Sequence, residues 1–374
     1  MCRMKRSFLY VLIFLFYGLP VYAESPALPP SLVPPSGFTA AVKTNKDEKV
    51  FCPPAINPYT GSLMLTSKYN GSGPSRDQID PDAKARFTKE TADITQFEKQ
   101  VSAMVAHSIS NGHPKTLECL LNQMTSWSKK NALLSTEANH TGRAMRKWAL
   151  ASIASSFLRL THSVSDPLSS HDQEIAPIKT WLLALAQRVV ADWSGLPIEK
   201  TNNHSYWAAW SVMASAVLLD RRDLFDWALN QYYIAASQVD KEGYLDNEMK
   251  RGQRALSYHN YALTPLVMIA AFARVNQVPL AELKQEPLSM LAHRVLQGYN
   301  NPLLFEGKTG KKQNLDDVTD KSKFAWLEPY CWAFSCDEIM TQRVARLRPL
   351  KSYRLGGDIT MLFACPPGCR PPSF

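Results

Sequence analysis

The chain has 374 residues, a formal net charge of +9 and a hydrophobic fraction of 45%. Its first 23 residues hold three of the Lys and Arg residues and no Asp or Glu, so the remainder has a net charge of +6. A charge of this size attracts anionic partners through the summed field of the protein, but it is too ordinary to identify one. Because the N-terminal segment predicts export, nucleic acid is excluded as the expected partner.

Residues 1–23 have the pattern of a secretory signal peptide. Three basic residues precede an apolar run of about twelve residues, and small or aliphatic residues lead to Ala23. A membrane-spanning helix needs roughly 20 apolar residues, so the run favours cleavage over anchoring. We predict cleavage after Ala23 and no membrane insertion of the remaining chain. An acidic polysaccharide fits both the charge and the destination of such a protein.

Six cysteines remain after the predicted cleavage, and an even number in an oxidising compartment favours disulfides. Cys331 and Cys336 are close in the sequence, as are Cys365 and Cys369. Pairing within these two groups leaves Cys52 and Cys119, which would then tie the N-terminal segment to the helical body. Six cysteines allow many other connectivities, which the sequence leaves open. The cysteine and histidine spacings do not suit zinc, and we expect no metal and no cofactor.

Residues 24–374 are expected to form a single domain, with its parts in the following order. Residues 24–60 are rich in proline, which breaks helices, and predict an extended lead-in over a core. Residues 61–86 are polar and rich in glycine and serine, and a loop of this length predicts a lid. Residues 87–340 show helical periodicity, and 341–374 are expected to be a C-terminal tail.

Apolar positions in the central part recur at intervals of three and four residues, which predicts helices joined by short turns. The predicted helices lie near residues 91–111, 115–130, 138–162, 172–193, 204–219, 222–238, 253–275, 281–299 and 324–336. Patterns typical of β-strands are scarce, and no strict repeat is present. Antiparallel helix hairpins in this number make a domain larger than usual. A ring of helix pairs accommodates this size, because its inner helices form one curved core. We therefore predict an all-α fold, an incomplete (α/α) toroid with a long lid loop.

Asn203 and His204 lie where a predicted helix begins, followed by Tyr206, Trp207 and Trp210. Aromatic faces stack on sugar rings, which makes this segment a candidate binding site. The alternative is structural: asparagine is a preferred N-cap residue, and tryptophans in a helix are often part of the core.

Arg251, Arg254 and Tyr258 are spaced by three and four residues, so that one helical face can present all three side chains. Arginine can hold a carboxylate through two parallel hydrogen bonds. A cation beside the phenol would lower the pKa of Tyr258 from its ordinary value. The alternative is a solvated basic helix end with a buried tyrosine.

Two further polar groups are candidates for substrate contact. Asn139, His140 and Thr141 lie at another helix start, and Lys68 lies in the predicted lid. Four acidic residues also gather in one segment, namely Asp240, Glu242, Asp246 and Glu248. Their spacing is typical of a solvated or turn-forming acidic segment rather than of the paired carboxylates of a glycoside hydrolase.

Imidazole, guanidinium, amide and phenol groups without a carboxylate pair suit β-elimination on a uronic acid. The C5 proton of such a sugar is very weakly acidic, because a carboxylate lies next to it. Hydrogen-bond donors must first neutralise that carboxylate, and pre-placed donors of this kind are often the largest catalytic contribution. A base then removes the C5 proton while an acid protonates the leaving C4 oxygen.

Long stretches of the chain closely resemble the mannuronate-specific alginate lyases of polysaccharide lyase family five. The similar stretches are residues 58–61, 67–69, 137–142, 145–150, 202–210, 222–227, 250–261, 326–331 and 354–358. They span nearly the whole chain after the predicted signal peptide. The resemblance implies an incomplete (α/α) toroid with a lid over a tunnel-like cleft, and it implies cleavage of alginate by β-elimination.

The resemblance also implies roles for residues at the matching positions. Asn203, His204 and Arg251 would neutralise the uronate carboxylate, and Tyr258 would act as general base, general acid or both. His204 could share the role of base. The expected substrate contacts are Ser67, Lys68, Tyr69, Asn139, His140, Thr141, Trp207 and Arg254.

The family context further implies a periplasmic enzyme that clears misdirected alginate, with the alginate secretion machinery as a further partner. Two other functions remain open from the sequence. One is a subunit that binds alginate without cutting it, and the other is an (α/α) hydrolase of another uronan.

Overall fold

Three helices rich in small and apolar residues form the centre of the computed structural model, which describes residues 30–69, 75–279, 281–316 and 320–363. They are α4 (His140–Thr161), α6 (Asn203–Leu219) and α9 (Ala255–Val275). Alanine and serine let neighbouring helices approach, and α6 is buried on every face. A helix without a polar stripe must be surrounded by other elements, and this explains its central place.

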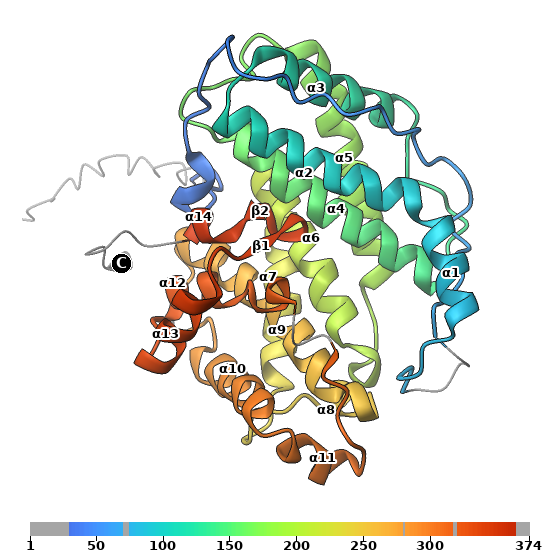
Figure 1. Cartoon of the computed structure of the whole chain (residues 1–374), viewed down its shortest axis with the longest axis vertical. Helices are drawn as coiled ribbons and strands as arrows, with labels where there is room; N and C mark the ends of the chain where they lie inside the picture. Colours follow the sequence, from blue (N-terminus) through green and yellow to red (C-terminus); the bar gives the residue numbers. More distant parts are fainter. Residues whose placement is uncertain (1–29, 70–74, 280, 317–319, 364–374) are drawn as a thin grey trace, which may run out of the picture. The chain divides into compact units, whose positions relative to one another are not determined.

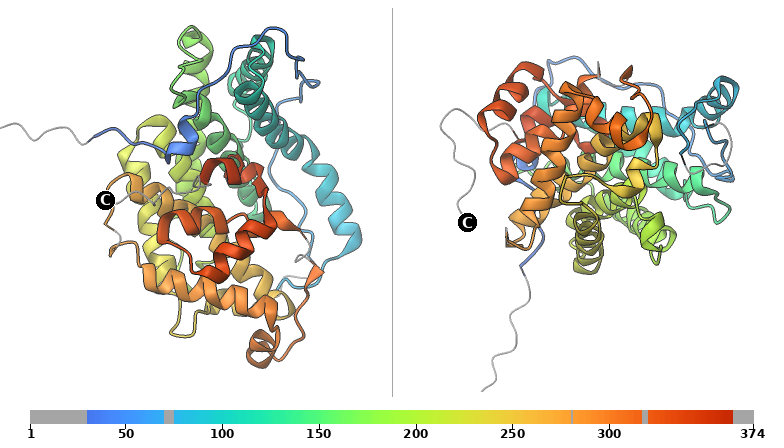
Figure 2. Two further views of the ribbon diagram at one scale, coloured as in Figure 1. Left: turned by 60° about the vertical axis from the view of Figure 1, so that its left-hand side comes forward. Right: turned by 90° about the horizontal axis from the view of Figure 1, so that it is seen from below.

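Five amphipathic helices surround this centre (Figures 1 and 2). They are α2 (Ala92–Ser110), α3 (Pro114–Lys129), α5 (Asp172–Trp193), α7 (Arg222–Ser237) and α10 (Gln285–Asn300). Helix α2 packs on α3 and α4, α5 on α3 and α6, α7 on α6, and α10 on α9. The incomplete (α/α) toroid predicted from the sequence is confirmed.

Shorter elements complete the structure: α1 (Pro81–Glu90), α8 (Asp246–Met249), α11 (Leu303–Thr309), α12 (Leu327–Phe334), α13 (Glu338–Leu347), α14 (Ile359–Phe363), β1 (Lys351–Ser352), β2 (Gly357–Asp358) and the 3₁₀ helices η1 (Ser36–Thr39), η2 (Ile198–Lys200), η3 (Gly252–Arg254), η5 (Lys321–Phe324) and η6 (Tyr353–Leu355). The two strands pair antiparallel, with Lys351 opposite Asp358 and Ser352 opposite Gly357. The turn requires Gly356 and Gly357, whose φ angles of 104° and 113° disfavour other residues.

The nine predicted helices all occur, within a few residues of the expected bounds, but two predicted boundaries are wrong. The expected lid of residues 61–86 runs into α1, which begins at Pro81 and is capped by the Asp80 side chain. Proline at the first helical position and aspartate before it are helix-start signals that the glycine-rich neighbourhood concealed. The expected tail beyond residue 340 is folded as far as Phe363, because it includes most of α13 and the β1–β2 hairpin.

The described part of the lead-in, residues 30–60, is extended apart from η1. It runs along α3, where the backbone N–H of Phe51 donates to Thr116 Oγ1 at 3.0 Å and Trp127 Nε1 donates to the Ile56 carbonyl at 3.0 Å. Disulfides Cys52–Cys119 and Cys331–Cys336 confirm two predicted pairs. The predicted pair Cys365–Cys369 and the predicted signal peptide lie outside the described residues.

The described residues from Leu32 to Phe363 form one packed unit. Among the helices that the structure describes, none combines the length and apolar character needed to cross a membrane.

Removal of the Cys52–Cys119 disulfide by substitution of both residues with serine is expected to lower the free energy of unfolding by about 4 kcal/mol. The bridge closes a long segment, with a sequence separation of 67 residues, and so restricts the unfolded chain strongly. The matched control is Cys331–Cys336, whose separation of 5 residues predicts a loss of about 2 kcal/mol. Urea denaturation of the two double variants would contradict this account if the short bridge proved more stabilising.

Candidate active site

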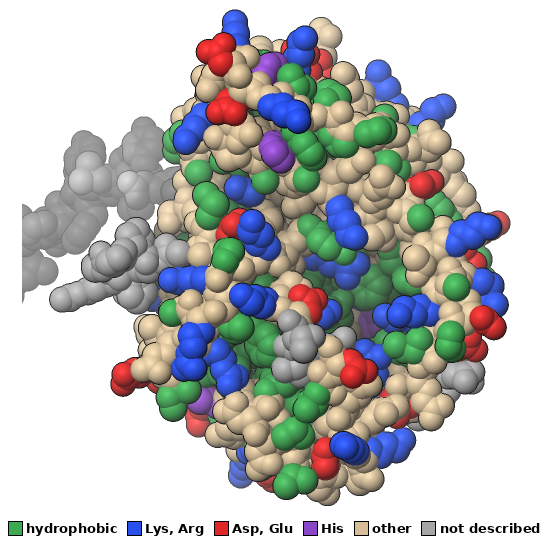
Figure 3. All heavy atoms as spheres, in the orientation of Figure 1, with side chains coloured by type: hydrophobic (Ala, Val, Ile, Leu, Met, Phe, Trp, Pro, Cys, Tyr) green, Lys and Arg blue, Asp and Glu red, His purple; other side chains and the backbone are tan. Residues whose placement is uncertain are grey.

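The N-terminal turns of α2, α6 and α9 line a cleft of about 800 Å³, together with Met145 and Trp148 from farther along α4. Helix N-termini carry partial positive charge, so their convergence favours an anionic ligand. Figure 3 shows a hollow with hydrophobic side chains at its base and Lys and Arg side chains around it. Among the described residues that line the cleft, five are cationic and one is acidic: Lys68, Lys99, Arg254, Lys323, Arg354 and Asp320.

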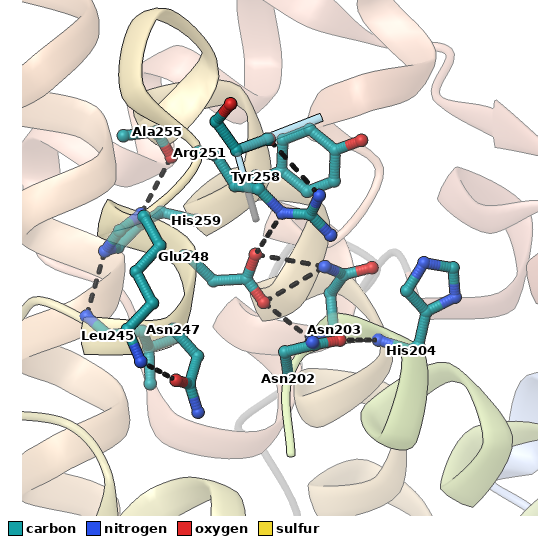
Figure 4. Close-up of polar contacts among 12 residues, drawn as sticks. Asn202, Asn203, His204, Leu245, Asn247, Glu248, Arg251, Ala255, Tyr258 and His259 are labelled. Carbon is teal, nitrogen blue, oxygen red and sulfur yellow. Dashed lines mark hydrogen bonds and ion pairs between the residues drawn. The ribbon is translucent and has the colours of Figure 1, made fainter. Parts of the chain in front are cut away.

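The Glu248 carboxylate is the centre of the polar network beside the cleft (Figure 4). Its Oε1 accepts from the backbone N–H of Asn203 at 2.6 Å, and Asn203 Nδ2 lies 3.0 Å from both carboxylate oxygens. Arg251 Nε lies 3.9 Å from Oε2. Glu248 is fully buried, and burial raises the pKa of its carboxyl against the opposing effects of Arg251 and Asn203. The expectation that Glu248 belongs to a solvated acidic turn is therefore wrong.

Asn203 is not the helix cap that the structural alternative proposed, because the Asn202 side chain accepts from the backbone N–H of His204 and caps α6. The Asn203 amide instead turns its nitrogen toward Glu248. Its Oδ1 is buried and has no hydrogen-bond partner among the described residues. The structure therefore directs the amide donors of Asn203 to Glu248, which differs from the expected direct donation to a substrate carboxylate.

Tyr258 and Tyr69 join their hydroxyls in a hydrogen bond of 2.6 Å. Arg251 Cζ lies 4.3 Å from the Tyr258 ring centroid, and Arg254 Cζ lies 5.7 Å from it, so both predicted arginines do flank the phenol. Burial and the neighbouring Tyr69 nevertheless raise the pKa of Tyr258, outweighing the two cations. The expected lowering of the Tyr258 pKa is therefore wrong.

The lowered pKa belongs to Tyr69 instead. Burial alone would raise the pKa of Tyr69, but the charge of Lys68, the hydrogen bond with Tyr258 and the charges of Arg254 and Arg251 together bring it below the ordinary value. Two phenols with pKa values displaced in opposite directions thus share one short hydrogen bond.

His204 lines the cleft between aromatic and cationic neighbours. Its ring stacks on Trp193 with centroids 5.6 Å apart, and the His140 ring meets it edge-on at 4.6 Å. Burial and the charge of Lys147 lower the pKa of His204 well below its ordinary value, and burial and Lys147 lower the pKa of His140 to about 4. Both imidazoles are therefore neutral near neutral pH.

The remaining predicted contacts divide into two groups. Lys68 lines the cleft with its Nζ 5.3 Å from the Tyr69 ring centroid, and Ser67 Oγ accepts from the Tyr69 backbone N–H at 3.3 Å. Asn139 instead caps α4, since its Oδ1 accepts from Gly142 N at 2.9 Å and its Nδ2 donates to the Leu65 carbonyl at 2.8 Å. Thr141 lies in the first turn of the same helix.

Trp207 forms part of the cleft wall rather than an open stacking platform. Its side chain is only 3% exposed, its ring stacks on Tyr261 and its Nε1 donates to the Tyr261 carbonyl at 3.1 Å. The structural alternative, that this tryptophan belongs to the core, describes it better.

A model of the alginate lyase family matches residues 64–305, which is more than half of the chain. The chain belongs to the alginate lyase family. An alginate lyase of Pseudomonas fluorescens strain SBW25 is 49% identical over 348 residues, covering 92% of this chain and 93% of the relative. An alginate lyase of Cobetia marina is 47% identical over 348 residues, covering 92% and 93%. The resemblance to alginate lyases found in the sequence is confirmed as membership of the alginate lyase family.

Solved structures of alginate lyases share the fold of this lyase. Alginate lyase A1-III from Sphingomonas species A1 aligns with a TM-score of 0.68 and 22% identity, covering 88% of this chain and 90% of that one. A variant of A1-III in complex with a tetrasaccharide aligns with a TM-score of 0.71 and 22% identity, covering 89% and 90%. As a family member, the protein is a polysaccharide lyase with alginate as its substrate.

The sequence arguments missed a second group of side chains in the wall of the lyase cleft. Arg354 comes from η6, in the segment predicted to be a tail, and its Cζ lies 4.8 Å from the Trp148 ring centroid. Its Nε contacts the buried Glu98 carboxylate at 3.4 Å. Arg354 and Glu98 are 256 positions apart in the sequence. The only sequence signal for Arg354 was the similarity of residues 354–358 to the family.

The lid segment is attached beside Arg251. Arg251 Nη1 donates to the Ser75 carbonyl at 3.4 Å, and Gln253 Nε2 donates to the Asp77 carbonyl at 3.1 Å. Lys311 Nζ lies 3.4 Å from Asp77 Oδ2. In the part of the chain that the structure describes, no group of three or more His, Cys, Asp or Glu side chains could hold a metal ion.

Replacement of Glu248 by glutamine is expected to remove part of the pH dependence of folding in the lyase. Since burial raises the pKa of Glu248, the folded protein is favoured while this carboxyl is protonated and loses stability as the pH rises above 4.5 toward the raised value. Urea denaturation across this range should give a flatter stability profile for Glu248→Gln than for the wild type. A steeper profile would show that the carboxylate stabilises the fold when ionised.

Proposed function

We propose that the protein is a poly(β-D-mannuronate) lyase that cleaves alginate by β-elimination and leaves a 4-deoxy unsaturated uronate at the new non-reducing end. The observation that carries this proposal is Tyr258, whose ring packs against the Arg251 guanidinium and which lines the same cleft as His204. A proton carrier, a cation and a neutral imidazole are thereby placed around one site for an anionic ligand.

Neutralisation of the uronate carboxylate is the first requirement of this reaction. The Arg251 guanidinium and the His204 imidazole are the candidate donors, supported by the partial charges of the α6 and α9 N-termini. Asn203 contributes indirectly, because Asn203 and Arg251 both contact Glu248 and are held together by it.

Tyr258 then moves the proton. As a phenolate it would take the C5 proton, the C4–C5 double bond would form, and the same hydroxyl would return that proton to O4 as the C4–O bond breaks. Its raised pKa makes the phenolate a strong base. Tyr69, whose lowered pKa favours its own phenolate, can in that ionised form accept the phenolic proton of Tyr258 across the 2.6 Å hydrogen bond. The departing oxygen and the C5 proton would lie on one face of the mannuronate ring.

We further propose that the enzyme acts in the periplasm, where it would clear alginate misdirected during secretion and meet the alginate secretion machinery. The signal-peptide pattern of residues 1–23 and the disulfides Cys52–Cys119 and Cys331–Cys336 support export to an oxidising compartment. Osmotic-shock fractionation tests this proposal, since retention of the full-length chain in the cytoplasm would contradict it.

The test of the activity is incubation with block-defined alginates. We expect the ultraviolet absorbance of an unsaturated uronate to rise on polymannuronate and to rise far more slowly on polyguluronate. New reducing ends without this absorbance would indicate a hydrolase, and binding without either signal would indicate a non-catalytic alginate-binding subunit. Equal rates on both polymers would overturn the mannuronate preference alone.

A further inference from the structure

Lys147 is a fully buried lysine of α4 that directs its ammonium at the catalytic face of α6. Its Nζ lies 2.8 Å from Nδ1 of His204 and 2.7 Å from the backbone carbonyl oxygen of the same residue. A carbonyl oxygen can only accept a hydrogen bond, so at least one Nζ hydrogen is committed to it. The direction of the second hydrogen bond, between Nζ and Nδ1, depends on whether the amine carries a lone pair.

Two indole faces beside Lys147 favour its ammonium form. Its Nζ lies 4.0 Å from the Trp193 ring centroid and 5.3 Å from the Trp148 ring centroid, and aromatic faces attract cations. Burial and the charge of Arg354 nevertheless outweigh the Glu248 carboxylate and hold the pKa of Lys147 well below its ordinary value, so the indole contacts are what favours the ammonium. An ammonium has three hydrogens and no lone pair, so it can only donate to Nδ1.

We propose that Lys147 is a positioning residue that fixes His204 in the tautomer with its proton on Nε2. A neutral imidazole that accepts at Nδ1 must carry its hydrogen on the other nitrogen. His204 then presents a hydrogen-bond donor to the cleft and has no free lone pair with which to remove a proton. This inference rests on the proposed function, in which the ligand of that donor is a uronate carboxylate.

The groups facing His204 keep the imidazole neutral, which the tautomer argument requires. His140 and Lys147 come from α4, Arg251 precedes η3, and Arg76 comes from the lid segment. Each of these groups, when charged, opposes a second proton on the ring. His204 therefore differs from Tyr258 in function, since it binds the carboxylate while Tyr258 alone moves the proton.

The first experiment observes the tautomer directly in the wild-type protein. Heteronuclear NMR of the full chain labelled with ¹⁵N-histidine, with His204→Gln for assignment, should show a protonated Nε2 and an unprotonated Nδ1 for His204 at neutral pH. A proton on Nδ1, or an imidazolium at neutral pH, would overturn the inference. This outcome is independent of the proposed function, which fails instead if wild-type enzyme yields no unsaturated product from polymannuronate.

The second experiment compares Lys147→Met with Lys147→Arg, which retains a cationic donor. We expect Lys147→Met to lower kcat/KM on polymannuronate by about 100-fold at neutral pH, and Lys147→Arg to recover part of this loss. The deficit of Lys147→Met relative to wild type should shrink as the pH falls, because an imidazolium carries protons on both nitrogens. A deficit that stays constant with pH, at equal helical content by circular dichroism, would assign Lys147 a purely structural role.

Discussion

Replacement of Tyr258 by phenylalanine is expected to lower kcat on polymannuronate by about 10³-fold or more while leaving KM close to the wild-type value. The substitution removes one hydroxyl from a side chain that lies within the cleft and leaves its ring against Arg251. The carboxylate-binding groups stay in place, so the substrate should still bind. Initial rates from the unsaturated-product absorbance, together with binding measured by calorimetry, separate the two effects.

Tyr69→Phe is the matched comparison for Tyr258→Phe. It removes the partner hydroxyl, which lies 2.6 Å from that of Tyr258 on the lid side of the cleft, and should cost about tenfold in kcat if Tyr69 only receives the phenolic proton. A Tyr258→Phe enzyme with an undiminished rate would remove Tyr258 from the reaction. A larger loss in Tyr69→Phe than in Tyr258→Phe would transfer the principal role to Tyr69.

Replacement of Arg251 by alanine is expected to lower kcat/KM by about 10² to 10³-fold and to raise KM as well. Arg251 is only 6% exposed, lies 4.3 Å from the Tyr258 ring centroid and contacts the buried Glu248. The substitution removes a cation from the substrate carboxylate and also leaves the Glu248 carboxylate without its counter-charge, so the variant should be less stable.

The double variant Arg251→Ala/Glu248→Gln separates these two consequences. Neutralising Glu248 should recover most of the thermal stability lost in Arg251→Ala, because no buried charge is then uncompensated. It should not recover kcat/KM, since the substrate carboxylate still has no guanidinium partner. Recovery of activity together with stability would show that Arg251 acts only through Glu248.

Local sequence patterns were sufficient to predict the helices of the ring. Helix α6 illustrates the reason, since Asn202 caps it and its apolar residues occupy every face. Caps and hydrophobic periodicity act within one or two turns, so they can be read along the chain. Local patterns also led to the wrong assignment of α1. Its start at Asp80 and Pro81 follows a glycine-rich segment, and the helix was therefore assigned to the lid.

The candidate catalytic residues were found partly through composition and mainly through the resemblance to a known family. The structure does bring His204, Arg251 and Tyr258 to one cleft and its immediate wall, as expected. The burial and the electrostatic environment of the residues in this site, however, could not be predicted from the sequence. Glu248 appeared to be one acid of a solvated turn, and the rise in the Tyr258 pKa depends on burial and on Tyr69, 189 residues away in sequence.

The sequence by itself determined the helices, their order and the chemical types available for the reaction, because these depend on neighbouring residues or on long matching stretches. It left the disulfide connectivity open. Only the tertiary structure decided which side chains are desolvated and which atoms face each other. Lys147 reaches His204 across 57 residues, and Arg354 reaches Glu98 across 256. Burial and charge proximity set pKa values and tautomers, and both arise only when helices distant in sequence pack together.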